Sequence, residues 1–465
     1  MRGYKMKHYD YDLVVLGSGP SGRRAAIQAA KWGFRVLVVE NRAPGGVSVH
    51  TGTIPSKTVR ETILNLTGFR ERNFYDKRIR KASIEEIFGR VQLTQQREIE
   101  VLKDQFSRNG VEYLEGRGSF VNSHTIKAED PAGNAKEVSA EKVIIAVGTR
   151  CFRPDNMVFD GTYVCDSDQI LSVKAIPDNV LVVGAGVIGV EYASILNILG
   201  RDVTVLDPRE KYLEFIDREI IGEFTAILEE RGVSFLLGQK LERVLSIEDG
   251  IVKVELQDGA VAETGMILYA AGRSGATSEL NLDSCGVSVD NRSRIPVNPS
   301  TFQTSEPNIY AVGDVVGFPA LASTSMAQGR IAVSHAFEKE SFELPEFFPY
   351  GIYAVPEIST SGATEEELRE KNVSYVVGRA KFTETSRGVI MGVEKGVLKL
   401  IFSAEDHTLL GVHIIGEGAA ELVHIGQAVL SFGGGMSYFI ENIFNFPTLA
   451  ETYKVAALNA WNQVN

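Results

Sequence analysis

The chain has 465 residues, a formal net charge of -12 and 44% hydrophobic residues. This length is about three times that of a typical single domain, so we expect two to four domains with substantial cores. The apolar content is that of a soluble globular protein. The negative charge argues against a general nucleic-acid binder and against an anionic membrane surface as partner. No apolar run is long enough to span a bilayer.

The cysteines and histidines predict neither a disulfide framework nor a metal site. Cys151, Cys165 and Cys285 lie far apart and form no CxxC pair, so we expect ordinary reduced thiols. The seven histidines show no zinc-ligand spacing. Residues 1–8 are basic but run into a strand-like segment without the apolar run of a signal peptide. We interpret them as a short disordered lead and expect a cytoplasmic protein.

The first segments in chain order predict one βαβ unit. Residues 11–16 are a short, apolar, β-branched run followed by a glycine-rich turn at 17–22. An alanine-rich helical stretch at 25–31 and a second buried strand at 36–39 complete the unit. The order of strand, glycine turn, helix and strand is typical of a dinucleotide-binding fold.

The same order recurs later in the chain. A strand at 180–183 precedes a glycine turn at 184–189, a helix at 191–199 and a strand at 203–206. The sequence therefore predicts two dinucleotide-binding units, and hence two bound dinucleotides.

Other segments predict further helices and strands. Between the two units we expect a helix at 84–109 and β-like pieces at 111–118 and 143–146. From about residue 346 the pattern indicates an α+β domain without a phosphate-binding loop, with strands at 373–382, 396–402 and 409–415 and helices around 419–431 and 451–461.

Each glycine of the first turn has a separate physical task. Gly17 makes the tight turn, Gly19 lets the backbone approach a pyrophosphate, and Gly22 permits close packing of helix on strand. The helix N-terminus then faces the phosphates. Glu40 ends the second strand about 20 positions later, where a carboxylate can bind a ribose 2′-hydroxyl.

The second turn repeats this pattern with Gly184, Gly186 and Gly189, and Asp207 takes the acidic position. Asp207 favours an unphosphorylated ribose and repels a 2′-phosphate, which indicates NAD. Arg209 could instead meet the 2′-phosphate of NADP, so both nucleotides stay open.

One further segment resembles a ligand-binding edge. Residues 304–314 are predicted to be a strand that ends in Gly313-Asp314, just before a helix at 322–336. An acid at the carboxyl end of a strand in an α/β domain can bind a ligand hydroxyl, although a simple turn is the commoner explanation.

In order and spacing, these motifs resemble the pyridine nucleotide-disulfide oxidoreductase family over nearly the whole chain, from about Tyr11 to Trp461. The resemblance implies FAD bound near Gly17, Gly19, Gly22, Glu40, Gly46 and Lys57, with Asp314 on the ribityl chain. It implies a nicotinamide nucleotide at Gly184, Gly186, Gly189, Asp207 and Arg209, with Gly148 at the crossover between domains. Gly272 is expected as a further cofactor-binding residue. It also implies a C-terminal dimer interface, and thus a homodimer or larger homo-oligomer.

The expected fold class is α/β, with two Rossmann-like dinucleotide-binding domains and a C-terminal α+β dimerisation domain. We predict four segments: a FAD-binding domain in two parts at 1–155 and 281–345, an NAD(P)-binding domain at 156–280, and the interface domain at 346–465.

Two departures from the family pattern remove its dithiol chemistry. Ser48 and Thr53 occupy the positions of the redox-active cysteine pair, and a hydroxyl can neither form a disulfide nor accept electrons from a flavin. Phe446 occupies the position of the acid-base histidine, and phenylalanine cannot transfer a proton. Glu451, the family's partner of that histidine, is expected to be a structural acid.

The hydride-transfer residues of the family are retained. The resemblance implies that Lys57 stabilises the reduced flavin and that Glu191 positions Lys57 and the nicotinamide. The alternatives are a surface cation for Lys57 and a solvated first-turn acid for Glu191. His50 lies between the two substituted positions, where we expect a loop histidine without a catalytic role.

Without a redox disulfide, the reduced flavin must pass its hydride to another acceptor. The simplest acceptor is a second nicotinamide nucleotide. Residues 52–57, 272–275 and 446–448 are similar to those of the soluble pyridine nucleotide transhydrogenases in this family. We therefore predict FAD-dependent hydride transfer between NADP(H) and NAD(H), with ping-pong kinetics. The alternatives are an NADH-dependent reductase of quinones, dyes, metal ions or oxygen, and a non-catalytic subunit that keeps FAD for structure.

Overall fold

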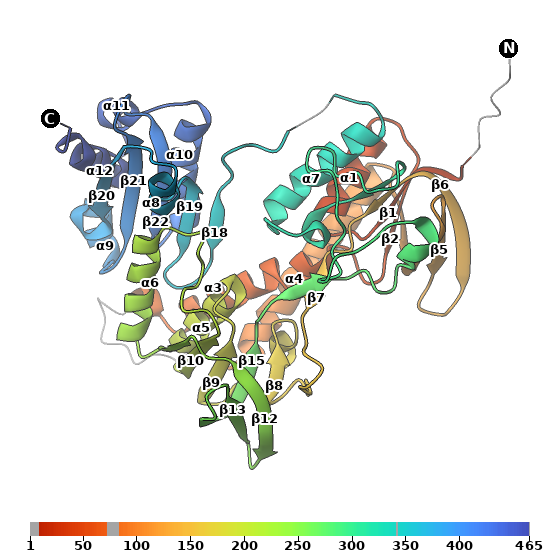
Figure 1. Cartoon of the computed structure of the whole chain (residues 1–465), viewed down its shortest axis with the longest axis horizontal. Coiled ribbons are helices and arrows are strands. Elements are labelled where there is room, and N and C mark those ends of the chain that lie inside the picture. Colours follow the sequence, from red (N-terminus) through yellow and green to blue (C-terminus); the bar gives the residue numbers. More distant parts are fainter. Residues whose placement is uncertain (1–8, 72–82, 341–342, 465) are drawn as a thin grey trace. The chain divides into compact units, whose positions relative to one another are not determined.

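The computed structural model describes residues 9–71, 83–340 and 343–464, so the lead predicted at residues 1–8 lies outside the described part. The chain divides into two compact units (Figure 1). The first unit comprises residues 1–59, 88–152 and 272–344, and the second comprises residues 60–87, 153–271 and 345–465.

A seven-stranded sheet forms the centre of the first unit. Its order is β3-β2-β1-β6-β5-β4, with β17 also paired to β6. The first half of the long strand β6 pairs antiparallel with β5, and its second half pairs parallel with β1 and β17. The strands are β1 Tyr11–Leu16, β2 Val36–Glu40, β3 Glu112–Glu115, β4 Arg117–Asn122, β5 Thr125–Glu129, β6 Ala135–Ile145 and β17 Ile309–Ala311.

Both faces of the parallel part of this sheet are buried, which explains the unbroken apolar runs of β1 and β2. Leu13 and Val15 pack in one core with residues of α1 (Pro20–Lys31) and α7 (Ala322–Ala336). Val14 and Leu16 point the other way, into a core shared with β4, β5 and the segment around Ile295. Figure 1 shows α1 and α7 lying side by side.

Local signals set the ends of α1. Pro20 is the first helical residue, where its missing N–H costs nothing. Gly33 follows the helix with φ +86°, and the amides of Gly33 and Phe34 donate to the carbonyls of Ala30 and Ala29. This is the glycine-terminated end that such a helix requires. The helix predicted at 84–109 is confirmed as α4, Ile84–Arg108.

The strand predicted at 304–314 is wrong in length, because only Ile309–Ala311 forms β17. Pro307 has no amide to donate to a ladder, and the Ile309 amide turns back to the Glu306 carbonyl. Asp314 therefore lies in a 3₁₀ turn, η4 (Gly313–Val316), that follows the strand.

The second unit contains a parallel five-stranded sheet of order β11-β10-β9-β15-β8. Helix α5 (Val187–Ile198) joins β9 to β10, and α6 (Arg218–Glu230) joins β10 to β11, which completes the second βαβ pattern. The strands are β8 Val164–Asp166, β9 Asn179–Val183, β10 Asp202–Asp207, β11 Ser234–Leu237 and β15 Met266–Tyr269. A three-stranded antiparallel sheet accompanies them, with β12 Leu241–Glu248, β13 Ile251–Leu256 and β14 Val261–Thr264.

The C-terminal part of the second unit is an antiparallel sheet of order β18-β19-β22-β21-β20. Helices α10 (Ala419–Ser431) and α12 (Glu451–Trp461) pack on it. Its strands are β18 Tyr350–Ile352, β19 Ile358–Gly362, β20 Tyr375–Lys381, β21 Val397–Ser403 and β22 Leu409–Ile415. The predicted α/β fold class is thereby confirmed, including the α+β character of this part.

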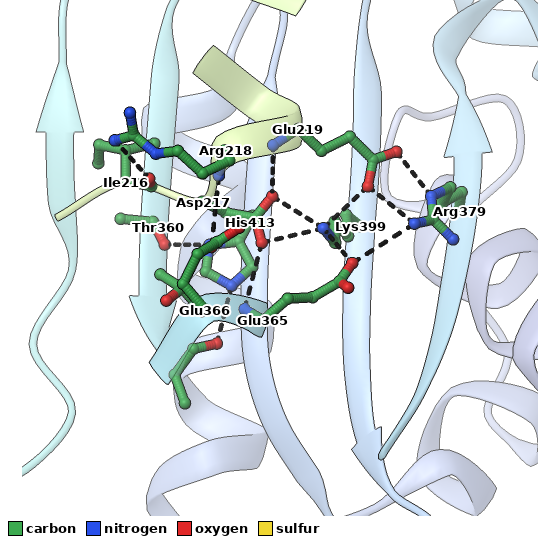
Figure 2. Close-up of polar contacts among 12 residues, drawn as sticks. Ile216, Asp217, Arg218, Glu219, Thr360, Glu365, Glu366, Arg379, Lys399 and His413 are labelled. Carbon is green, nitrogen blue, oxygen red and sulfur yellow. Dashed lines mark hydrogen bonds and ion pairs between the residues drawn. The ribbon is translucent and has the colours of Figure 1, made fainter. Parts of the chain in front are cut away.

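A buried charge cluster joins α6 to this antiparallel sheet (Figure 2). Lys399 on β21 is 1% exposed, and its ammonium lies 2.8 Å from an Asp217 oxygen, 2.8 Å from Glu219 and 2.6 Å from Glu365. Asp217 also caps α6 by accepting from the amide of Glu219. Arg379 contacts both glutamates from the adjacent strand. No local sequence signal predicts this cluster.

Candidate functional site

The first glycine turn, residues 17–22, forms a cradle, by which we mean a backbone turn before a helix where side chains on the glycines would occupy the space. Gly17 has φ +100°, and a Cβ there would clash with the carbonyl oxygen of Ala146. A Cβ on Gly22 would clash with the carbonyl oxygen of Gly17. In contrast, a Cβ on Gly19 would have no atom within 4 Å, so open space lies before the N-terminus of α1. Backbone amides facing open space at a helix start are suited to the pyrophosphate of FAD.

Glu40 is held at the rim of this cradle. It is 7% exposed, and its Oε2 accepts from the amide of Ser18 at 2.9 Å and from the Ser18 hydroxyl at 2.8 Å. The same hydroxyl accepts from the amide of Gly45 at 2.9 Å. A Cβ on Gly46 would lie 2.9 Å from the Cα of Gly19. The sequence predicted Glu40 and Gly46 here but gave no sign that Ser18 links Glu40 to Gly45.

Asp314 lies next to the first turn of α1. A Cβ on the preceding Gly313 would lie 2.6 Å from the Ser21 hydroxyl, so only glycine brings η4 this close. The Gly313 amide donates to the Gln328 side chain at 2.7 Å. Burial raises the pKa of Asp314, although the charge of Arg273 opposes this. A half-buried carboxyl in this place suits a partner with hydroxyl donors, such as a ribityl chain.

Two further glycines that were predicted to bind a cofactor, Gly148 and Gly272, border a two-stranded sheet in the first unit. Gly148 (φ +65°) precedes β7 (Thr149–Cys151), and Gly272 (φ +116°) precedes its antiparallel partner β16 (Arg273–Gly275). A Cβ on either glycine would meet no atom within 4 Å. The positive φ values, rather than crowding, explain glycine at both positions.

The second glycine turn, in the second unit, repeats the first. Gly184 has φ +109°, and a Cβ there would lie 2.8 Å from the carbonyl of Ala270. A Cβ on Gly189 would clash with the carbonyl oxygen of Gly184, while one on Gly186 would meet nothing within 4 Å. The helix start of α5 thus offers the same open cradle to a nicotinamide nucleotide.

Asp207 ends β10 beside this second turn. It is 2% exposed, and it accepts hydrogen bonds from the amide of Ala185 and from both the amide and the side chain of Arg209. Burial would raise the pKa of Asp207, but the hydrogen bonds from Arg209 outweigh it and hold that pKa below its usual range. The sequence predicted both residues at the site without predicting that they pair.

Glu191 is not the solvated acid that the alternative interpretation expected. It is 4% exposed on α5, and its Oε1 accepts from the amide of Tyr353 at 2.8 Å, within the second unit. Lys57 lies half-buried on α3 (Thr53–Leu66), in the part of that helix that belongs to the first unit. The expected pairing of Lys57 with Glu191 stays a prediction.

The segment at the position of the family's redox centre is helical, and hydroxyl side chains stand where the family has cysteines. Ser48 lies on the short helix α2 (Gly46–His50) and donates to the carbonyl of Gly45 at 2.9 Å, while Thr53 begins α3. His50 is helical rather than in a loop, and its Nε2 lies 2.8 Å from the carbonyl oxygen of Ala43. This contact links the His50 ring to the backbone at Ala43.

The C-terminal positions match this loss of thiol chemistry. Phe446 is 70% exposed, and Glu451 begins α12 with its Oε2 buried and no donor to it among the described residues. Cys151, Cys165 and Cys285, all within the described part, form no disulfide. The described residues also contain no cluster suited to a metal ion and no helix long and apolar enough to cross a membrane.

These two cradles and their acids place the chain among known proteins. Residues 11–329 match the family described as pyridine nucleotide-disulphide oxidoreductase, and residues 348–457 match its dimerisation domain. The chain belongs to the pyridine nucleotide-disulphide oxidoreductase family, whose members bind FAD, and it is a flavin-dependent oxidoreductase.

Similar proteins of full length point to one branch of this family. The chain is 45% identical to the soluble pyridine nucleotide transhydrogenase of Mycobacterium bovis (strain BCG / Pasteur 1173P2) over 460 residues, covering 98% of each chain. It is 40% identical to that of Colwellia psychrerythraea over 465 residues, covering 98% of this chain and 99% of the relative.

Solved structures give the same fold. LpdA from Mycobacterium tuberculosis matches with a TM-score of 0.89 and 25% identity, over 96% of this chain and 98% of that one. The HOCl-induced flavoprotein disulfide reductase RclA from Escherichia coli matches with a TM-score of 0.87 and 25% identity, over 96% and 99% of the two chains.

Proposed function

We propose that the protein transfers hydride between the two nicotinamide nucleotides through FAD, in the reaction NADPH + NAD⁺ ⇌ NADP⁺ + NADH. One observation carries this proposal: both dinucleotide cradles are complete, while Ser48 and Thr53 stand where a redox dithiol would be. Electrons that enter through a nicotinamide nucleotide thus have no thiol exit at this segment.

Hydride balance supports a second nucleotide as acceptor. FAD, when bound, takes up a hydride from one nicotinamide ring and can return it to another. The overall reaction moves one hydride and neither releases nor consumes a proton. The acid-base histidine of thiol chemistry is therefore unnecessary, which agrees with Phe446 at its position.

The chain's own residues hold the cofactors and the charge. The Gly19 cradle and Glu40 hold FAD, and the Gly186 cradle binds the nicotinamide nucleotide. The cation of Lys57 stabilises negative charge that develops on the flavin. Glu191 is buried and fixed by the Tyr353 amide, so it can orient the nicotinamide without reorganisation.

The assembly we propose is a homodimer in the cytoplasm. The family's dimerisation domain at residues 348–457 supports self-association. Within it, Phe432 and Ile443 are 90% and 95% exposed, as is usual for side chains that a partner covers. Thiols that form no disulfide suit a reducing compartment.

An anaerobic titration tests the function. The FAD-loaded protein is titrated with NADPH and, separately, with NADH, and flavin absorbance is followed before the other oxidised nucleotide is added. We expect both to bleach the flavin and the second nucleotide to restore its colour. Bleaching by NADH alone would contradict the proposal and favour the NADH-dependent reductase, while bleaching by neither would indicate a structural flavin.

A further inference from the structure

The hydrogen-bonding capacity of the Asp207 carboxylate is already used. Its Oδ2 accepts from the amide of Ala185 at 2.7 Å and from Nη2 of Arg209 at 2.8 Å. Its Oδ1 accepts from the amide of Arg209 at 2.9 Å and from Nε of the same residue at 2.8 Å. A carboxylate offers about four acceptor positions, so a ribose hydroxyl finds Asp207 engaged.

The equivalent acid of the first cradle is held differently. Glu40 receives two hydrogen bonds from Ser18 and one from the amide of Arg42, at 3.2 Å. Among the described residues no guanidinium lies against it. The position of Ser18 is occupied by Ala185 in the second cradle, where Arg209 supplies the side-chain donors instead. The charge of Asp207 is thus neutralised by an adjacent cation, while that of Glu40 is not.

The guanidinium of Arg209 can move without moving its backbone. The side chain is 52% exposed, whereas Asp207 is buried. The Arg209 carbonyl accepts from the amide of Gly238, and the Asp207 carbonyl accepts from the amide of Gln239. If the guanidinium turns away, Asp207 keeps its two backbone donors, the amides of Ala185 and Arg209.

We propose that Arg209 is the residue that lets this one site accept both nucleotides, by alternating between Asp207 and the 2′-phosphate of NADP(H). With NADP(H), the guanidinium binds the phosphate in a bidentate manner, as its planar fork allows. With NAD(H), it stays near Asp207, or turns aside and frees one oxygen for the ribose 2′-hydroxyl. This inference rests on the proposed transhydrogenase function, which requires one protein to bind both nucleotides.

Binding of oxidised nucleotides tests the proposal without any hydride transfer. Dissociation constants of NADP⁺, NAD⁺ and 2′,5′-ADP are measured by titration calorimetry on FAD-loaded wild type and Arg209→Gln. We expect Arg209→Gln to weaken NADP⁺ and 2′,5′-ADP by about 10- to 100-fold, the effect of a lost charged hydrogen-bond pair. NAD⁺ binding should be unchanged or tighter.

A matched control distinguishes the loss of Arg209 from the loss of any exposed arginine that pairs with a carboxylate. Arg243 forms a comparable exposed pair with Glu255, at 2.6 Å in the same unit, so Arg243→Gln should change neither affinity. Asp207→Asn should shift selectivity the other way, because it removes the charge that repels the phosphate. Arg209→Lys should recover part of the NADP⁺ affinity.

Three outcomes would overturn the proposal: equal weakening of NADP⁺ and NAD⁺ in Arg209→Gln, no effect on either, or no NADP⁺ binding by the wild type. Equal weakening of NADP⁺ and NAD⁺ binding would show that Arg209 only stabilises the loop that follows β10. If selectivity shifts as expected but no hydride passes between nucleotides, the proposed function fails while the role of Arg209 stands.

Discussion

The two glycine cradles share one backbone design and differ in the side chains that hold their acids. In each, the third glycine packs against the carbonyl of the first, and the middle glycine faces open space. Glu40 is bonded by a serine hydroxyl, whereas Asp207 is bonded by the guanidinium of Arg209, whose side chain is 52% exposed. The comparison indicates that the same backbone fold can hold a cofactor that stays bound, FAD, and a substrate that is exchanged, the nicotinamide nucleotide. The two cradles then differ in the side chain that hydrogen-bonds the acid, Ser18 in the first and Arg209 in the second.

The largest expected effect comes from blocking each cradle in turn. In Gly22→Ala the new methyl group would clash with the Gly17 carbonyl, so the purified protein should lack flavin absorbance. In Gly189→Ala the clash is with Gly184, so the protein should keep FAD but resist reduction by NADH and NADPH.

Two helical glycines with open surroundings serve as controls for these variants. A Cβ on Gly89 or Gly222 would meet no atom within 4 Å, so Gly89→Ala and Gly222→Ala should retain flavin and activity. Loss of FAD from Gly189→Ala, or a normal flavin content in Gly22→Ala, would contradict the assignment of the two cradles.

The buried cluster around Lys399 should dominate the stability of the second unit. Lys399→Met leaves the carboxylates of Asp217 and Glu365 without their shared cation, at a cost of about 3–5 kcal/mol in unfolding free energy. Denaturant unfolding monitored by circular dichroism measures this. Lys395→Met removes an exposed pair with Glu230 and should cost less than about 1 kcal/mol. Equal losses in the two variants would show that the cluster is not stabilising.

The hydride step should depend on Lys57. Lys57→Met removes the cation expected beside the flavin, so flavin reduction by NADPH should slow by about 100- to 1000-fold while FAD content is unchanged. Stopped-flow absorbance measures the rate, with the exposed Lys103→Met as control. An unchanged rate would remove Lys57 from the mechanism.

The smallest expected effect concerns the serine that distinguishes the first cradle. Ser18→Ala removes the hydroxyl that bridges Glu40 and Gly45 and makes this position match Ala185 of the second cradle. The loss of about 1–2 kcal/mol should weaken FAD roughly 5- to 30-fold, measured by refilling the apoprotein. Nicotinamide nucleotide affinity should not change, and a change there would argue against independent cradles.

The sequence predicted the backbone of both cradles because their signals are local. Buried parallel strands read as unbroken apolar runs, and the positive φ values of Gly17 and Gly184 demand glycine. The acids followed from their spacing to these glycines. The strand before Asp314 was predicted too long because residues 304–308 are mostly polar and turn back at Pro307, so that only Ile309–Ala311 forms a strand.

The side-chain partners could not be predicted because they depend on geometry rather than on pattern. Ser18 and Glu40 lie 22 positions apart, and nothing in the sequence aims one at the other. Lys399 and Asp217 are separated by 182 positions. Arg209 was recognised as a cation near the ribose, but its three hydrogen bonds to Asp207 emerge only when β10 and the following loop are folded.

Steady-state kinetics test the central claim most directly, which is that one nucleotide site serves donor and acceptor in turn through the flavin. Initial rates are measured with varied NADPH at several fixed concentrations of NAD⁺. We predict parallel lines in double-reciprocal plots, because the first product leaves before the second substrate binds. Intersecting lines would show that both nucleotides bind together and would contradict the account.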